Sequence, residues 1–266
     1  MKAGFVQYAP IFGEPEKNLE KLLSLLNETP SADLLVLPEL CNSGYNFSSK
    51  EQALSLAEEA SDSRFVAALH DFCARRNLYI ATGFNEKEGD TLFNTALLVG
   101  PEGLIGKYRK IHLFLNEKDI FAPGNAGLPV FDTAAGKIAM LVCFDWVFPE
   151  VWRILALKGA DVICHCSNLV LPGFAQKSVP THALVNHVYV ITANRIGTEK
   201  NLTFTGMSTI ADPLGNVIYQ ASADKEELKV LDFDLNLARN KQMTPKNDLF
   251  ADRRPDLYGE ILTASE

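Results

Sequence analysis

Three polar side chains in this chain could share one reaction: the carboxylate of Glu39, the ammonium of Lys110 and the thiol of Cys143. Glu39 follows the apolar run LLVLP, Lys110 lies within KYRKIHLF, and Cys143 follows the apolar run KIAMLV. These positions predict burial or strand ends. Each group is costly to bury alone, and the cost falls when the groups meet. We therefore predict that the three side chains form one site.

Cys143 stands where an apolar strand ends and, a few residues later, a helix begins. The expected helix PEVWRILALKGA has Pro149 near its start and Gly159 near its end. The positive end of its dipole would favour the thiolate, which is the form of cysteine that attacks. A cysteine in an apolar strand is most often a small inert side chain, so Cys143 becomes a candidate only together with Glu39 and Lys110.

Strands and helices alternate along the chain around these residues. Short apolar runs predict strands, and apolar residues at helical spacing predict helices. The expected strands are 2–9, 33–39, 78–84, 93–99, 137–143, 161–167, a pair around the turn PLGN within 206–220, and 228–235. The expected helices are 15–30, 50–77 and 149–160, and a helix that continues into a strand is expected over 182–197. This alternation predicts a layered α/β protein with helices covering the sheet faces. The pattern itself allows two sheets packed face to face or one doubly wound sheet.

The composition argues against several classes of protein. Of 266 residues, 47% are hydrophobic and the mean hydropathy is +0.01, which indicates a compact fold. The formal net charge is −8 and GKYRK is the nearest approach to a basic stripe, so we expect no nucleic-acid partner. No apolar run approaches the roughly 20 residues of a membrane span, and the N-terminus is unlike a signal peptide, so we expect no membrane partner and a cytoplasmic location. Five cysteines, an odd number, favour free thiols.

The chain predicts a single domain. No low-complexity linker interrupts residues 1–266. The tail from roughly 240 to 266 has no sustained period, and we expect it to run over the surface or onto a neighbouring subunit.

The motifs LPEL, KYRKIHLF and CFDWVFPE, in that order, make this chain resemble the carbon–nitrogen hydrolase, or nitrilase, superfamily. The resemblance extends from VQYAP near the start through ADPLGNVI to LNLARN. It implies an α/β fold of the nitrilase type, an αββα four-layer sandwich. It also implies a homodimer or a higher homo-oligomer that pairs through helices, with the tail crossing to the partner.

The resemblance assigns a catalytic role to each of the three polar residues. Cys143 resembles the nucleophile, which attacks the carbon of an amide or nitrile. Glu39 resembles the general base that takes the thiol proton and later activates water. Lys110 resembles the group that stabilises the developing oxyanion, beside the backbone N–H of Phe144. The resemblance implies that this triad works without a cofactor.

Further residues are assigned by their motifs. Glu117, seven residues after Lys110, resembles a second family glutamate that would position Lys110 or the substrate. The segment NLVLP lies where the family has a pocket loop, which makes Asn168 and Leu169 candidate substrate contacts. Two aromatic side chains, Tyr45 and Trp146, are candidate substrate contacts as well.

A zinc site at Cys164, His165 and Cys166, with His182 and His187 nearby, is the competing hypothesis for this region. In a strand, however, Cys164 and Cys166 face one side and His165 the other. The usual two-residue spacing between zinc-binding cysteines is also absent. We therefore expect no metal.

The predicted function is that of a cysteine-dependent hydrolase that cleaves a C–N bond of a small amide through a thioester and releases ammonia. Two alternatives stay open: a true nitrilase and a catalytically silent relative that acts as a binding protein. Nitrilases commonly have Cys-Trp-Glu at the nucleophile, whereas this chain has Cys-Phe-Asp, which favours the amide. All three triad residues are present, which speaks against the silent relative. The sequence does not identify the substrate.

Overall fold

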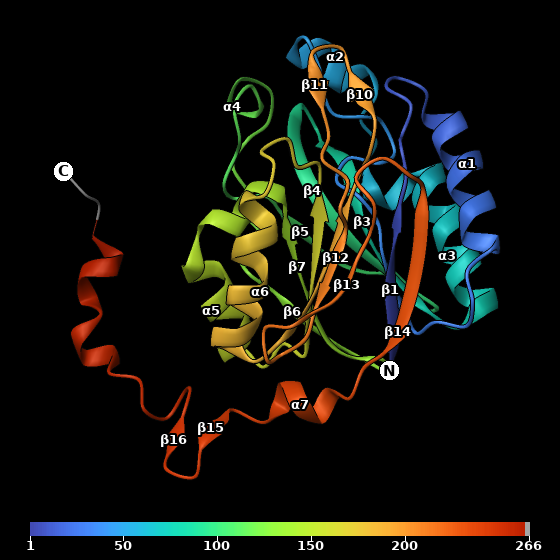
Figure 1. Ribbon diagram of the computed structural model, residues 1–266. Helices are drawn as coiled ribbons and strands as arrows, with labels where there is room; N and C mark the ends of the chain where they lie inside the picture. The colour runs from blue at the N-terminus through green and yellow to red at the C-terminus, as the bar shows by residue number, and fades with distance from the viewer. Residues whose placement is uncertain (264–266) are drawn as a thin grey trace.

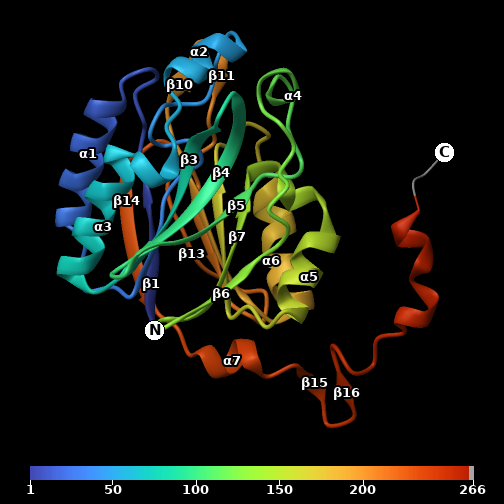
Figure 2. The ribbon, with the colours of Figure 1, turned by 180° about the vertical axis from the view of Figure 1, so that it is seen from behind.

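Two six-stranded sheets pack face to face, and helices cover both outer faces (Figure 1). The computed structural model describes residues 1–263. Helices α1 (Pro15–Asn27) and α3 (Arg64–Arg76) lie outside the first sheet, whereas α5 (Pro149–Leu157) and α6 (Phe174–Asn186) lie outside the second. The view from behind shows the same order of layers (Figure 2). The fold is therefore the expected αββα sandwich.

The first sheet has the strand order β14-β1-β2-β3-β4-β5. Strands β1, β2 and β3 are parallel. Strand β14 pairs with β1, β4 with β3 and β5 with β4, each in the antiparallel direction. The bounds are β1 Lys2–Gln7, β2 Leu34–Val36, β3 Tyr79–Glu88, β4 Thr91–Gly100, β5 Gly103–Arg109 and β14 Glu227–Asp232. Strand β2 is fully buried on both faces, as its continuous apolar run predicts.

The second sheet repeats this plan with the order β13-β12-β9-β8-β7-β6. Its central strands β7, β8 and β9 are parallel. The bounds are β6 Val130–Thr133, β7 Gly136–Val142, β8 Val162–Ser167, β9 Tyr189–Asn194, β12 Thr209–Ala211 and β13 Val217–Gln220. Because parallel strands end at the same edge of a sheet, residues that follow β7 and β8 lie close together.

Two expectations about the first half were wrong. The helix expected over 50–77 is divided into α2 (Lys50–Ser55), a 3₁₀ turn (Ala60–Asp62) and α3. The interruption has two causes: Glu58 forms a β-bridge with Glu86 of β3, and the Ser63 hydroxyl caps α3 by accepting the N–H of Val66. Strand β5 was not expected at all, because its alternation is weak in sequence.

Shorter elements complete the fold. The hairpin β10 (Thr198–Glu199) and β11 (Leu202–Thr203) lies beside α2 at one end of the sandwich, and α4 (Glu117–Ile120) follows β5. After β14 come α7 (Leu235–Arg239), the hairpin β15 (Gln242–Thr244) and β16 (Asn247–Asp248), and two 3₁₀ turns (Pro255–Leu257 and Gly259–Leu262). No helix within residues 1–263 is long and apolar enough to cross a membrane.

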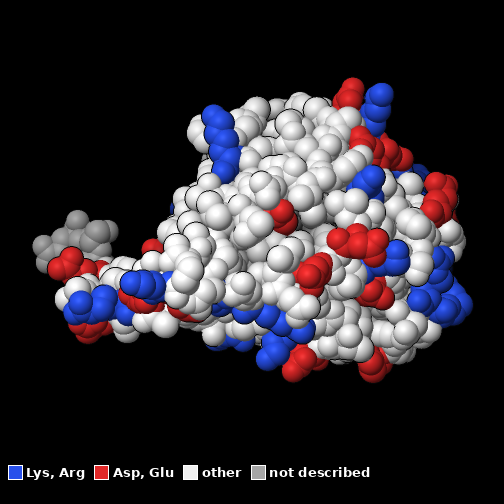
Figure 3. All heavy atoms as spheres, turned by 60° about the horizontal axis from the view of Figure 1, so that its bottom comes forward, with Lys and Arg blue, Asp and Glu red and all other residues white. Residues whose placement is uncertain are grey.

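Residues 240–263, here called the C-terminal arm, leave the body of the sandwich and turn back beside α5 at a distance (Figure 1). The arm projects from the body in the space-filling view as well, where acidic and basic side chains are interspersed over the visible face (Figure 3). A cavity of about 740 Å³ separates α5 and α6 from the end of the arm. The end of the arm is thus separated from α5 and α6 by this cavity.

Candidate active site

The four residues at the centre of the site follow four different strands. Glu39 comes after β2 and Lys110 directly after β5, so the first sheet supplies the carboxylate and the ammonium. Cys143 comes directly after β7 and Asn168 directly after β8, so the second sheet supplies the thiol. The side-chain amide of Asn168 donates to the backbone carbonyl of Glu39 at 2.9 Å, which ties the two sheets together here.

Lys110 lies between two carboxylates. Its Nζ donates to Glu39 Oε1 at 2.8 Å and to Glu117 Oε1 at 2.7 Å, and all three side chains are buried. Asn94 Nδ2 donates to the same Glu39 oxygen at 2.7 Å. The second oxygen, Glu39 Oε2, has no hydrogen-bond partner within residues 1–263. An unpartnered carboxylate oxygen in a buried site is available to accept a proton.

Burial and charge shift the pKa values of this group in different directions. Burial raises the pKa of Glu39 to about 6, with Lys110 acting to lower it and Glu117 to raise it further. Burial by itself would lower the pKa of Lys110, but the carboxylates of Glu117 and Glu39 outweigh that effect and raise it. Lys110 therefore stays a cation, while Glu39 can exchange a proton near neutral pH.

The backbone of β3 passes very close to the backbone of Glu39 and helps to position it. A Cβ on Gly83 of β3 would lie 2.3 Å from Glu39 Cα and 2.4 Å from Leu40 N. Only glycine lets β3 pass this close to the segment that carries the carboxylate. The backbone N–H of Gly83 also donates to Pro38 O at 3.0 Å, which fixes that segment just before Glu39.

The backbone at Cys143 is strained and is held from both sides. Cys143 has a φ of +42°, a left-handed conformation that is unfavourable for a residue with a Cβ. The N–H of Val142 donates to Asp145 Oδ2 at 2.9 Å, and the carbonyl of Cys143 lies 2.8 Å from His165 Nε2. Because a carbonyl can only accept, Nε2 carries the proton, and Nδ1 accepts from the Thr192 hydroxyl at 3.0 Å.

The two side chains that hold the Cys143 backbone are themselves fixed. Asp145 accepts from the Tyr108 hydroxyl at 2.7 Å, and His112 Nδ1 lies 2.7 Å from its other oxygen. Burial lowers the pKa of His165 to about 4, so His165 is neutral at physiological pH. The ring acts as a hydrogen-bond donor and carries no charge to the site.

The thiol is protonated in the resting protein. Burial is the largest influence and raises the pKa of Cys143, and the carboxylates of Glu39 and Glu117 raise it further. Lys110 and the backbone N–H of Asn168 act in the opposite direction and are outweighed. Because these influences together raise the pKa of Cys143, attack by the sulfur needs a base that takes the thiol proton.

Tyr45 extends the hydrogen-bond network. Its hydroxyl donates to Glu117 Oε1 at 2.7 Å, the same oxygen that accepts from Lys110. The N–H of Phe114 donates to the other Glu117 oxygen at 3.2 Å. Tyr45, a candidate substrate contact, is thus bonded to the carboxylate that holds Lys110, and it does not line the cavity beside the sulfur.

A small cavity of about 10 Å³ opens beside the sulfur. Apart from the thiol, its wall is aromatic or aliphatic: Phe114, Phe144, Trp146, Leu169, Val170 and Leu171. Two of the candidate substrate contacts, Trp146 and Leu169, line this cavity together with Phe144, whereas Asn168 contacts Glu39 and is not part of this wall. Val170 and Leu171 lie in the segment NLVLP, which was assigned to the pocket loop, whereas no motif pointed to Phe114.

Comparison with known proteins identifies the family. The sequence model of the carbon-nitrogen hydrolase family matches residues 2–242. The chain belongs to the carbon–nitrogen hydrolases.

Relatives of this hydrolase match along nearly the whole chain. A protein named nitrilase from Pyrococcus abyssi is 46% identical over 97% of this chain and 99% of its own length. An (R)-stereoselective amidase from a Pseudomonas species is 31% identical over 98% of this chain and 94% of its own. A carbon-nitrogen hydrolase from Helicobacter pylori has a crystal structure that superposes with a TM-score of 0.89 at 26% identity, over 99% of this chain and 98% of that one.

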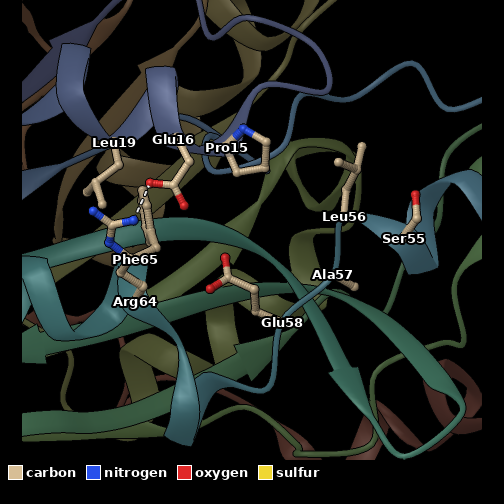
Figure 4. A pocket seen from close by; sticks show the side chains of 9 residues that line it. All are labelled: Pro15, Glu16, Leu19, Ser55, Leu56, Ala57, Glu58, Arg64 and Phe65. Carbon is tan, nitrogen blue, oxygen red and sulfur yellow. Dashed lines mark hydrogen bonds and ion pairs between the residues drawn. The ribbon is translucent and has the colours of Figure 1, made fainter.

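The hydrolase keeps a second cavity apart from the thiol. It has a volume of about 270 Å³ and lies between α1, the end of α2 and the start of α3 (Figure 4). Glu58 points into it, and Arg64 is paired with Glu16 at its edge. None of the residues that line it belongs to the cluster around Lys110, so we do not assign it to the reaction.

The histidines and cysteines of this hydrolase do not gather as a metal centre in the described residues. All five cysteines are free and buried, as the odd count suggested. Within residues 1–263 no three His, Cys, Asp or Glu side chains are placed to hold one ion. His165 bonds to the Cys143 backbone, and His182 stacks on Trp152 with ring centroids 4.7 Å apart.

Proposed function

We propose that this carbon–nitrogen hydrolase cleaves the C–N bond of a small amide through a thioester on Cys143 and releases ammonia. One observation carries the proposal. A buried ammonium lies between two carboxylates beside a protonated thiol, and one oxygen of Glu39 has no partner. This arrangement contains a nucleophile, a base and an electrostatic stabiliser.

The first half of the reaction forms the acyl-enzyme. Glu39 Oε2 takes the thiol proton while Sγ attacks the amide carbon, and the carbonyl becomes an oxyanion. Lys110 and the backbone N–H of Phe144 stabilise that charge. The C–N bond then breaks, the nitrogen leaves as ammonia with the proton that Glu39 had taken, and a thioester remains on Cys143.

The second half releases the acid. Glu39, ionised again, takes a proton from a water molecule as the water oxygen attacks the thioester carbon. The C–S bond breaks and Glu39 returns the proton to the sulfur. The products are a carboxylic acid and a regenerated thiol, so the cycle needs only substrate and water. Glu117 holds Lys110 in place during both halves.

The wall of the cavity favours small acyl groups without charge. Apart from the thiol, the side chains that line it are aromatic or aliphatic and leave little free volume beside the sulfur. A charged substituent would lose its hydration there without an opposite partner. A small aliphatic amide therefore fits better than an amino acid derivative.

A true nitrilase is the second candidate, favoured by the relative named nitrilase at 46% identity. The nucleophile motif Cys-Phe-Asp differs from the Cys-Trp-Glu of that branch, and Asp145 is occupied in holding the backbone before Cys143. We therefore rank the amide first. Both substrates would pass through a covalent adduct on the same sulfur, so one experiment tests both.

The test is intact-protein mass spectrometry with a panel of short amides and nitriles, alongside an ammonia assay. We expect a transient acyl adduct on the wild type from at least one amide, and none on Cys143→Ala. Turnover confined to nitriles would reverse the ranking. Absence of any adduct and any ammonia across the panel would contradict both and leave the catalytically silent relative as the better description.

We further propose that the hydrolase works as a homodimer formed through α5, α6 and the C-terminal arm. The cavity of about 740 Å³ between them is lined by exposed apolar side chains, including Ile154, Leu157 and Ile261. Arg153 Nη1 is buried there without a hydrogen-bond partner among the described residues. A second copy that inserted its own α5 and α6 would cover this apolar surface.

Light scattering at micromolar concentration tests the dimer. We expect a mass of twice 29.3 kDa or a multiple of it for the wild type. Ile154→Glu places a charge in the proposed interface and should shift the mass toward the monomer, whereas Leu104→Glu, an exposed apolar position on β5, should leave it unchanged. A monomeric wild type would rule the dimer out.

A further inference from the structure

A buried ion pair that the reaction itself does not use joins Glu199 of β10 to Arg195, the residue directly after β9. Glu199 and Arg195 are 5% and 1% exposed, and Arg195 Nη1 donates to Glu199 Oε1. Arg195 Nη2 donates to Pro10 O at 2.9 Å, and its guanidinium lies over the Phe204 ring at 4.1 Å from the centroid. The pair is therefore fixed from several sides.

The second oxygen of Glu199 holds a loop from the other half of the chain. Glu199 Oε2 accepts the backbone N–H of Tyr45 at 3.0 Å and that of Asn46 at 2.8 Å. The Asn46 side chain donates back to Glu199 O at 2.9 Å. Glu199 and Tyr45 are 154 positions apart in the sequence, so this contact joins two distant segments.

The loop held in this way delivers the Tyr45 hydroxyl to the candidate active site. Tyr45 donates to Glu117 Oε1, and Lys110 donates to the same oxygen. The Tyr45 ring also packs edge-on against Phe204, the ring that Arg195 covers. The backbone and the ring of Tyr45 are thus both fixed by the Arg195–Glu199 pair.

We propose that Glu199 is a positioning residue of this hydrolase: by holding the backbone at Tyr45 and Asn46, it sets the Tyr45 hydroxyl on Glu117 and thereby the place of the Lys110 ammonium. This inference rests on the proposed function, because it assigns Lys110 to the oxyanion. Residues 42–47 form no helix or strand, so the position of Tyr45 depends on side-chain contacts.

Glu199→Gln is a sharp test because both oxygens of Glu199 accept hydrogen bonds. A glutamine has one acceptor oxygen and one NH₂ group. In one orientation of the glutamine amide its NH₂ group faces Arg195, and in the other it faces the backbone N–H groups of Tyr45 and Asn46. Because two donors cannot bond to each other, the contact on that side is lost. Tyr45→Phe removes only the final link to Glu117 and leaves the backbone contacts in place.

The experiment is a double-mutant cycle on kcat and KM with Glu199→Gln, Tyr45→Phe and both together. We expect each single variant to lower kcat/KM about tenfold, mainly through kcat, and the double variant to fall no further than Tyr45→Phe alone. Equal and additive losses would overturn the proposal, because Glu199 would then act independently of Tyr45. Glu199→Asp, which keeps the charge but withdraws the oxygens, replaces Glu199→Gln if the latter does not fold.

Asp161→Asn is the matched control. Asp161 is a buried carboxylate that also pairs with an arginine, Arg239, at 2.9 Å and accepts a backbone N–H, that of Lys137, at 3.0 Å. It precedes β8, at the strand end opposite Asn168. We expect this variant to lose stability and to keep its kcat per folded molecule. A similar loss of kcat in this control would mean that any broken ion pair impairs the hydrolase, and would overturn the specific role of Glu199.

The same cycle is measured on the rate at which iodoacetamide alkylates Cys143, followed by mass. This rate requires no substrate, so it separates two failures. A wild type that turns over nothing contradicts the proposed function, yet non-additive alkylation rates would still support the positioning role. Additive alkylation rates in an active enzyme would overturn the positioning role alone.

Discussion

Two neighbouring residues, Arg109 and Lys110, lie at the centres of two charge clusters that differ in their hydrogen bonding. Each cation lies between two carboxylates: Arg109 contacts Glu86 and Glu88, and Lys110 contacts Glu39 and Glu117. Both cations are almost completely buried. Composition therefore does not distinguish the clusters. Burial differs at one carboxylate, since Glu88 is exposed whereas Glu39 and Glu117 are buried. The further difference lies in which atoms have hydrogen-bond partners.

The guanidinium of Arg109 is fully engaged in hydrogen bonds. The guanidinium forms paired bonds to both carboxylates and a further bond to Asn125 Oδ1 at 2.8 Å. Burial would raise the pKa of Glu86, but hydrogen bonds from Arg109, Lys107 and Thr95 outweigh it and lower the pKa. This cluster holds its charges in one state, as expected of a structural ion pair.

Around Lys110 one oxygen is left without a partner and one carboxylate has a raised pKa, both on Glu39. A point-like ammonium also leaves room for a developing oxyanion, which a guanidinium engaged on both sides does not. The cluster that we propose as the reactive one therefore differs from the Arg109 cluster by an oxygen without a hydrogen-bond partner near the thiol. A buried salt bridge alone would have pointed equally to Arg109.

The largest expected effect is that of Cys143→Ala. Removal of the nucleophile should lower kcat by at least about a thousandfold, because no thioester can form. The measurement is ammonia release from the best amide of the panel. Residual turnover above one percent of wild type would show that the chemistry does not pass through this sulfur.

Lys110→Met should lower kcat about a hundred- to a thousandfold, because the oxyanion loses its cation. Lys110→Arg should not restore activity, since a planar fork cannot take the place of the ammonium between Glu39 and Glu117. Steady-state kinetics measure both variants, with circular dichroism to confirm the fold. Full activity of Lys110→Arg would show that a guanidinium can replace the ammonium between Glu39 and Glu117, and would contradict the distinction between the two clusters.

His165→Phe should lower kcat by about ten- to a hundredfold, because the carbonyl of Cys143 loses its donor and the strained backbone can relax. His165→Gln, whose amide can reach the same carbonyl, should recover a large part of the loss. Equal losses in both variants would indicate a packing role only. Because the pKa of His165 is about 4, neither variant should change the shape of the pH profile above pH 5.

The pH dependence of kcat/KM should have an acid limb near pH 6, where Glu39 in the free enzyme gains its proton. The sign follows from its role: the base must be ionised, so kcat/KM falls as pH drops through the raised pKa. At pH 5 we expect about a tenth of the plateau value, and the midpoint belongs to the coupled cluster as a whole. A limb near pH 4.5 or below would contradict the raised pKa.

Glu86→Gln should have the smallest effect on turnover and a clear effect on stability. Loss of a buried ion-pair partner should reduce the free energy of unfolding by about 3 kcal/mol. We expect kcat per folded molecule within twofold of wild type. Denaturant unfolding and active-site titration measure the two quantities, and a large fall in kcat would show that the Arg109 cluster also positions Lys110.

The sequence predicted the central part of both sheets because continuous apolar runs indicate strands buried on both faces. It missed β5 because Lys107 and Arg109 interrupt the pattern, and their partner Glu86 lies on β3, far away in sequence. It also joined α2 to α3, because the β-bridge at Glu58 depends on that same strand. Local pattern gives no information about such pairings.

The candidate site followed a similar division. Glu39 and Cys143 could be placed because each follows an apolar strand, and the motifs supplied Lys110 and Glu117. The contacts of His165 and Glu199 could not be predicted, because each side chain bonds to a backbone group of a residue that is distant in the sequence. A side chain that bonds to another residue's backbone leaves no pattern in its own neighbourhood.

The small cavity beside the sulfur also bears on the chemistry that Cys143 avoids. The thiol is protonated at rest, 5% exposed, and enclosed by Phe114, Phe144 and Trp146. Peroxide reacts with thiolates, so a protonated sulfur behind an aromatic wall is a poor target for oxidation. The same enclosure would thus preserve the nucleophile between turnovers, and the hydrolase should lose activity to peroxide far more slowly than a protein with an exposed thiolate.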